Sequence, residues 1–233
     1  MIPRWHLVPN LDAWLSQARA FVLAKAASAI AERGVFHLAL AGGETPRKLY
    51  ALLARDETQD WSRWHLWLGD ERCLPPDDPA RNSVMVQAAW LDFTPAAHFH
   101  PIPAELGSEA AAAAYCIARQ AQPAFDLALL GLGEDGHTAS LFPGQDWGEH
   151  PDTPAALAIR NAPKPPAARV SLSARQLSDS HAVLFLISGA GKRAAVTQWA
   201  AGDVIPASAI EPRAGCDALL TADATPDFIF PGA

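Results

Sequence analysis

Cysteines are scarce in this sequence, and their spacing excludes a disulfide framework. Only three of the 233 residues are cysteine, and Cys73, Cys116 and Cys216 lie far apart with no Cys-x-x-Cys pair. An odd number at this spacing also argues against a structural zinc site. We expect reduced thiols and no bound metal.

Long apolar runs and clusters of positive charge are missing as well. No stretch approaches the ~20 apolar residues of a membrane span, and residues 1–6 lack the basic and apolar segments of a secretory leader. The sequence has 18 Lys and Arg against 25 Asp and Glu, a net charge of -7, with no basic run. We therefore expect a cytoplasmic protein that binds neither nucleic acid nor membrane, and that captures any anionic substrate locally.

The composition is that of a packed globular protein. Half of the residues are apolar and 18% are charged, which is enough apolar material for a sizeable core. A chain of this length is ordinary for one α/β domain, and no repeat or linker separates two cores. We expect residues 1–233 to form a single domain.

Helical and strand patterns alternate along the chain. Apolar residues recur at helical spacing over residues 11–33, and Gly34 follows as a stop signal. Short apolar runs predict buried parallel strands at residues 35–41, 64–68, 125–130, 183–188 and 217–221. Helices are predicted at residues 45–53, 82–91, 109–120 and 191–199. This alternation predicts a Rossmann-like, mainly parallel sheet with helices on both faces.

Residues 145–168 are rich in Pro, Asp and Gly and show little periodicity. We predict a strand at 156–160 and no other element there. The segment fits either a surface excursion or a lid.

Ligands of open α/β sheets bind at the carboxyl ends of the strands, and polar clusters follow several predicted strands here. The first is Gly42-Gly43-Glu44-Thr45-Pro46. Its glycines allow close backbone approach, Thr45 is placed to cap a helix, and the helix amino terminus attracts a phosphate. The same residues equally fit a capped turn without a ligand.

The second cluster, Gly69-Asp70-Glu71-Arg72, places two carboxylates beside an arginine. Such a group can polarise a carbonyl, hold a sugar hydroxyl, or form a weak exposed ion pair. We expect the surface role for Glu71 and leave Asp70 and Arg72 open. Asn82-Ser83, further along, fits a helix cap.

The third cluster contains Gly131-x-Gly133-x-x-Gly136, a bare match to the dinucleotide fingerprint. Asp135 would lie beside the pyrophosphate and Pro143 would shorten the following helix, so we reject a nicotinamide site. His137 follows this glycine-rich backbone, with an acid two residues earlier, where water and a ligand can both arrive. A histidine titrates near neutrality, so His137 is the predicted general base, and the other seven histidines are expected to be structural.

Ser188-Gly189-Ala190-Gly191-Lys192 partly matches a phosphate-binding loop. Leu186 replaces the upstream glycine and Arg193 replaces the hydroxyl residue, so no nucleoside triphosphate site is expected. Lys192 remains a candidate cation for a simple sugar phosphate.

Four segments, residues 40–46, 67–75, 125–143, and 169–173 with 189–192, together resemble the 6-phosphogluconolactonase family of the glucosamine-6-phosphate isomerase/deaminase superfamily. The third segment is the most specific. Deaminases share its Asp-Gly-His core but continue with Asn-Glu-Pro, whereas this chain continues with Thr-Ala-Ser-Leu-Phe-Pro. The resemblance implies hydrolysis of 6-phospho-D-glucono-1,5-lactone to 6-phospho-D-gluconate, in the oxidative branch of the pentose phosphate pathway.

The resemblance also implies a role for each site residue. His137 would activate water, Arg72 would steady the carbonyl oxygen or the substrate charge, and Lys192 with the Gly42-Gly43-x-Thr45 loop would hold the 6-phosphate. Arg169 would assist with the phosphate.

Two acids complete the implied site. Asp135 would orient His137 or water, while Asp70 occupies the position of a catalytic acid or base in the deaminases, with its duty here left open. Attack of water on a lactone needs a base and oxyanion stabilisation, but no metal or redox cofactor.

Glu44 departs from the family, which commonly has a small polar residue at this position. A carboxylate there would repel phosphate, so we expect the side chain to point away. The alternatives are a deaminase-like isomerase on the same fold and a non-catalytic sugar-phosphate binding protein. We expect a monomer or weak homodimer.

Overall fold

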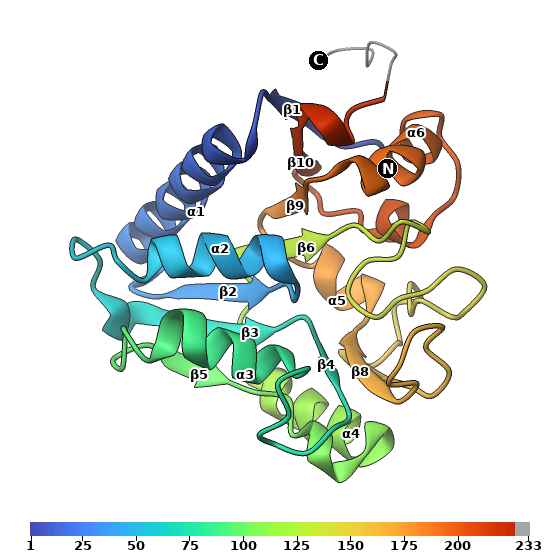
Figure 1. Cartoon of the computed structure of the whole chain (residues 1–233). Coiled ribbons are helices and arrows are strands. Elements are labelled where there is room, and N and C mark those ends of the chain that lie inside the picture. Colours follow the sequence, from blue (N-terminus) through green and yellow to red (C-terminus); the bar gives the residue numbers. More distant parts are fainter. Residues whose placement is uncertain (227–233) are drawn as a thin grey trace.

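The main sheet of the protein has seven strands, all parallel to their neighbours (Figure 1). We describe it from a computed structural model, in which residues 1–226 are described. The spatial order is β1-β10-β9-β6-β2-β3-β5. The strand bounds are β1 Arg4–Val8, β2 Phe36–Leu40, β3 Trp64–Leu68, β5 His98–His100, β6 Leu127–Gly131, β9 Val183–Ile187 and β10 Cys216–Thr221.

The strand order reverses between β2 and β6. From β2 the chain steps outward through β3 to β5, and from β6 it steps the other way through β9 to β10. This is the Rossmann order, with β1 added at one edge, and it confirms the predicted fold class. The edge strands β1 and β5 were not predicted, because half-exposed strands carry a weak apolar pattern.

Helices cover both faces of this sheet, as predicted. Trp64 packs against Trp90, with ring centroids 5.9 Å apart, in the π-helical turn that continues α3. Trp67, three residues on and therefore on the opposite face, packs near Tyr115 of α4 at 6.1 Å. The helices are α1 Leu11–Arg33, α2 Glu44–Leu53, α3 Asn82–Val86, α4 Ser108–Gln120, α5 Ala174–Ser178 and α6 Arg193–Ala200. None of the helices in residues 1–226 has the length and apolarity to cross a membrane.

Two predicted helix caps are wrong. The N-cap of α2 is Gly43, and the hydroxyl of Thr45 instead pairs with Ser188 Oγ at 2.7 Å. The N-cap of α3 is Arg81, because the Asn82 amide turns inward to Asp70. In both cases a tertiary partner takes the side chain that local sequence would assign to the helix end.

A buried carboxylate caps α3 from outside the helix. Glu71 is fully buried, and its oxygens accept hydrogen bonds from the backbone nitrogens of Asn82 and Ser83, both at 2.8 Å. Arg81 lies 3.5 Å from the same carboxylate. The expected surface ion pair of Glu71 is therefore wrong, since helix capping and Arg81 offset the cost of burying its charge.

A second sheet of three antiparallel strands, in the order β4-β8-β7, stands beside the main one. Its strands are β4 Asp70–Arg72, β7 Ala156–Ile159 and β8 Arg169–Leu172. The predicted strand near 156–160 is confirmed, and residues 70–72, for which no separate strand was predicted, form β4. Gly69 joins the sheets, because its N–H donates to Leu40 O at 2.9 Å and its carbonyl accepts from Leu172 N at 2.8 Å.

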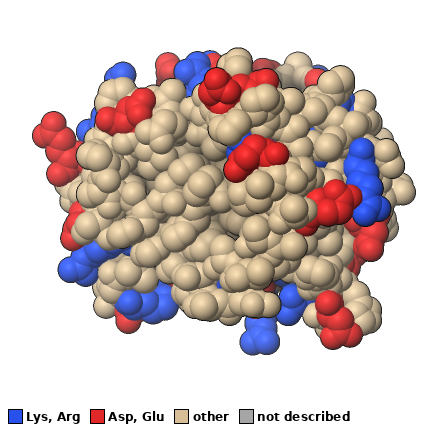
Figure 2. Space-filling model, turned by 90° about the horizontal axis from the view of Figure 1, so that it is seen from below, with Lys and Arg blue, Asp and Glu red and all other residues tan. Residues whose placement is uncertain are grey.

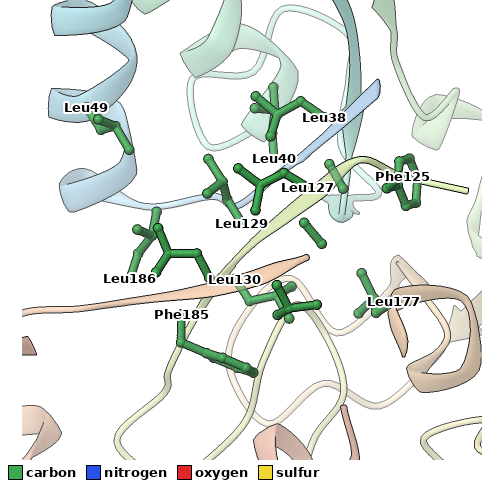
Figure 3. Packing of buried hydrophobic residues seen from close by; sticks show 14 of the residues in the cluster. Leu38, Leu40, Leu49, Phe125, Leu127, Leu129, Leu130, Leu177, Phe185 and Leu186 are labelled. Carbon is green, nitrogen blue, oxygen red and sulfur yellow. The ribbon is translucent and has the colours of Figure 1, made fainter. Parts of the chain in front are cut away.

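The core beside the strand-order reversal is built largely of leucines (Figure 3). Leu38, Leu127, Leu129 and Leu186 come from β2, β6 and β9, and each is at most 4% exposed. Burying one such side chain stabilises the fold by roughly 1.5–3 kcal/mol. These central strands are therefore a firm base for the loops at their carboxyl ends.

Four histidines stack on the face that α4 covers. The ring of His65 lies 4.5 Å from that of His37, 4.6 Å from that of His98 and 5.3 Å from that of His100. Burial, with the charges of His65 and Arg119, lowers the pKa of His37 to about 4. Burial and the same surroundings lower the pKa of His100 to about 4.

Acid should destabilise the fold through this cluster. An unfolded histidine has a pKa near 6.5, so below about pH 6.5 the unfolded state gains protons first and stability is lost as the pH falls toward 4. The free energy of unfolding of the wild type should fall between pH 7.5 and pH 5. We expect this fall to be smaller by roughly 1–2 kcal/mol in His100→Gln, as measured by urea unfolding. The control His150→Gln changes a side chain that is 74% exposed, so its free energy of unfolding should fall with pH as much as that of the wild type. An unchanged pH dependence in His100→Gln would contradict this account.

Candidate active site

A cavity of about 240 Å³ opens at the strand-order reversal. It is lined by residues 40–43 at the carboxyl end of β2, residues 69–70 after β3, and residues 130–134 at the carboxyl end of β6. Its polar and charged side chains are Asp70, Arg72, Asn82, Glu134, His137, Thr138, Lys164, Arg169 and Lys192. The reversal is where ligands of doubly wound sheets are expected to bind.

His137 and Asp135 form a pair at the edge of this cavity. The imidazole Nδ1 lies 2.5 Å from Asp135 Oδ1, which also accepts the backbone N–H of His137 at 3.2 Å. Gly136 between them has φ +83°, and a side chain there would lie 2.9 Å from Ile205. Within residues 1–226, the His137 Nε2 has no hydrogen-bond partner. The free nitrogen is therefore the one able to exchange protons with water or a ligand.

The charge of Asp135 is well defined. Partial burial raises the pKa of this carboxyl, but the hydrogen bond from His137 and the imidazolium charge lower it more, and the resulting pKa is below the ordinary value. Asp135 thus stays ionised at neutral pH. An ionised acceptor at Nδ1 favours the tautomer of His137 that carries its proton on Nδ1 and leaves Nε2 as an acceptor.

Arg72 is the last residue of β4 in the second sheet and lines the cavity. Its Nη1 donates to Ala80 O, and its Nε is buried with no partner in the described part of the chain. The buried Nε is a costly unpaired donor, whereas the side chain as a whole lines the cavity and brings a positive charge to it.

Lys192 and Lys164 supply positive charge on another side of the cavity. Burial lowers the pKa of Lys192, Glu134 and Asp135 raise it, and Lys164 lowers it. The resulting pKa of Lys192 is below its ordinary value. Lys164 was not predicted, because it falls in the segment 145–168 that the sequence pattern left unassigned.

Asp70 lines the cavity but is already engaged. Its Oδ2 accepts the Ser140 hydroxyl at 2.5 Å, and its Oδ1 accepts the Asn82 amide at 3.0 Å. Both carboxylate oxygens are thus held. This arrangement suits a fixed acceptor better than a group that exchanges protons.

The first glycine cluster lies where the sequence predicts it. Gly42 and Gly43 line the cavity, and a Cβ on Gly42 would lie 2.2 Å from Asn82 Oδ1, so only glycine fits there. Thr45 does not line the cavity. Glu44 also lies outside it and binds Arg47 at 2.7 and 2.8 Å, so its side chain points away as expected.

Arg169 forms part of the cavity wall with most of its guanidinium occupied. Its Nε donates to Pro166 O at 3.1 Å, and its Nη2 donates to Lys164 O at 2.8 Å and Pro165 O at 3.4 Å. The side chain therefore fastens a loop as well as facing the cavity.

The sequence of this chain is similar to a family of known proteins. Residues 9–219 match the family model described as glucosamine-6-phosphate isomerases/6-phosphogluconolactonase. The chain belongs to this family. A 6-phosphogluconolactonase from Synechocystis is 34% identical over 223 residues, which cover 88% of each chain.

Solved structures of the family share the fold. A 6-phosphogluconolactonase from Thermotoga maritima has a TM-score of 0.85 and 27% identity, covering 94% of this chain and 99% of that one. A monomeric glucosamine-6-phosphate deaminase has a TM-score of 0.79 at 22% identity, covering 95% and 98%. The fold of the family is therefore common to proteins of both names, and activity must be argued from the site.

The family fold brings most of the predicted site residues together. Those lining the cavity are Gly42, Gly43, Asp70, Arg72, His137, Arg169 and Lys192. Asp135 stands behind His137, and Thr45 lies outside. Asn82 and Glu134 were missed as cavity residues, since Asn82 had the sequence signal of a helix cap and Glu134 that of a polar loop.

The Asp135 pair gives a direct prediction. Asp135→Asn keeps the shape but removes the charge that supports protonated His137. A hydrogen bond to a charged group contributes about 1.5–3 kcal/mol. We therefore expect kcat for hydrolysis of 6-phospho-D-glucono-1,5-lactone to fall roughly ten- to hundredfold, with little change in KM. Asp152→Asn, at a side chain that is 93% exposed, is the matched control. A rise in KM with kcat unchanged would show that Asp135 acts in binding instead.

Proposed function

We propose that this chain hydrolyses 6-phospho-D-glucono-1,5-lactone to 6-phospho-D-gluconate, with His137 as the general base. The observation that carries the proposal is the His137–Asp135 pair, whose free Nε2 lies at a cavity that also holds Arg72 and two lysines. Membership of the family and the names of its relatives support the substrate.

The first step is attack of water on the lactone carbonyl. His137 Nε2 takes a proton from the water while the new C–O bond forms at C1 and the carbonyl electrons move to its oxygen. Arg72, which lines the cavity, stabilises the oxyanion with its positive charge. The ionised Asp135 supports the positive charge that His137 acquires.

The second step opens the ring. The tetrahedral intermediate collapses, the bond from C1 to the ring oxygen breaks, and protonated His137 returns its proton to that oxygen, which becomes the 5-hydroxyl. The new carboxylic acid loses its proton to solvent. His137 thus acts first as base and then as acid, with no net change in the enzyme.

We also propose that residues 1–233 work as one domain and that a single copy of the chain is sufficient. The second sheet continues directly from β3 through Gly69, whose backbone is hydrogen-bonded to both sheets. All residues of the proposed mechanism come from this chain, which fits a monomer or a weak homodimer. A cytoplasmic location stays a prediction of the sequence.

The central test is the hydrolysis rate of freshly generated 6-phosphogluconolactone, followed by acid release at a pH where spontaneous opening is slow. Wild type should be fast, and His137→Ala should lose about 10²–10⁴ in kcat, the usual contribution of a general base. His150→Ala serves as the matched control, and thermal unfolding of each variant checks that it is folded.

Other outcomes identify the alternatives. Ammonia release from glucosamine 6-phosphate would indicate the deaminase activity. Tight binding of 6-phosphogluconate, with no rate above the spontaneous one, would indicate a binding protein. An active His137→Ala would leave the lactonase activity standing and remove the base from His137.

A further inference from the structure

Two ammonium groups face the cavity without partners. Lys164 and Lys192 both line it, and neither Nζ donates a hydrogen bond to any residue in the described range. The charge of Lys164 repels the Lys192 ammonium, and this repulsion is part of what lowers the pKa of Lys192. Such a pair is relieved by an anion bound between the two groups.

One lysine alone gives this side of the cavity little net positive charge. Glu134 lines the cavity close to Gly191, and both Glu134 and Asp135 attract the Lys192 ammonium. A doubly charged phosphate meeting Lys192 would therefore also meet carboxylates. The acids offset much of the positive charge of Lys192, and Lys164 adds a second positive charge that can attract the phosphate.

The backbone of Lys164 is fixed although its side chain is exposed. Arg169, only 6% exposed, holds three consecutive carbonyls of the loop through its Nε and Nη2, including that of Lys164. The loop is closed at its base by Ala162 N donating to Ala167 O at 2.9 Å. Lys164 thus differs from an ordinary surface lysine, because the hydrogen bonds of Arg169 fix the position of its backbone beside the cavity.

We propose that Lys164 binds the substrate phosphate together with Lys192, and that Arg169 is a positioning residue that holds Lys164 over the cavity. The inference rests on the proposed function and deepens it, since it assigns a phosphate-binding residue in the segment 145–168. It also changes the expected role of Arg169 from a phosphate ligand to the anchor of one. The two lysines and the Gly42-Gly43 backbone would then surround the same group.

The test compares binding of 6-phosphogluconate and of gluconate, which lacks the phosphate, by calorimetry. Lys164→Met should raise the Kd for 6-phosphogluconate about ten- to hundredfold, as expected for loss of a charge-assisted hydrogen bond. Binding of gluconate should not change, and Lys164→Arg should restore most of the affinity. Lys25→Met, at an exposed lysine of α1, controls for the loss of one charge.

The role of Arg169 is tested with a double variant. Arg169→Lys keeps the charge but cannot hold three carbonyls, so it should weaken 6-phosphogluconate binding in the wild-type background. In the Lys164→Met background the same change should have little further effect, because its target is gone. Equal effects in both backgrounds would show that Arg169 binds the phosphate independently, and would overturn the positioning role.

The proposal for Lys164 is overturned if Lys164→Met changes the Kd for 6-phosphogluconate less than twofold, or weakens gluconate binding equally. These results are separable from the activity. A chain without lactone turnover whose binding of 6-phosphogluconate depends on Lys164 would retain this inference and lose the proposed function. If the chain hydrolyses the lactone at full rate and binds 6-phosphogluconate independently of Lys164, the proposed function is kept and this inference is overturned.

Discussion

The reversal of strand order between β2 and β6 is the constraint on which the rest of the structure depends. The chain leaves these two neighbours in opposite directions, so no crossover covers their carboxyl ends. An opening remains there, and its walls are the loops that follow the two strands. Apolar packing on both faces of β2 and β6 holds those loops at a constant separation. The glycine-rich sequences after both strands let backbone line the opening.

A second constraint closes the third side of the cavity. Gly69 is hydrogen-bonded to both sheets, so Asp70 enters the wall at a fixed position. Its buried carboxylate accepts hydrogen bonds from Ser140, three residues after the histidine, and from Asn82 at the start of α3. Unpaired burial of this charge would be costly, so the bonds are needed for the fold as well as the site. One acid thereby links the loop of the base, the helix beside the glycines and the second sheet.

The sequence was informative where local pattern and tertiary structure agree. The central strands are apolar and lead into glycines, so their existence, their parallel arrangement and the position of His137 could all be predicted. Thr45 and Asn82 were assigned as caps because short polar side chains before a helix usually cap it, but Ser188 and Asp70 are distant in sequence and compete for them. Lys164 could not be found by periodicity, because its loop is held by the Arg169 side chain and not by repeating backbone structure.

The placement of the acids explains how a chain of net charge -7 can act on an anion. The general base requires an ionised partner, yet a carboxylate in contact with the substrate would repel it. Asp135 stands behind the imidazole and does not line the cavity, whereas His137, Arg72 and Lys192 do. The ring of His137 therefore separates the acid that supports it from the phosphorylated ligand. Two other acids, Asp70 and Glu134, do line the cavity, but the cations Arg72, Lys164, Arg169 and Lys192 outnumber them there. Because Coulomb interactions weaken with distance, this local balance affects an anionic ligand more than the net charge of the chain does.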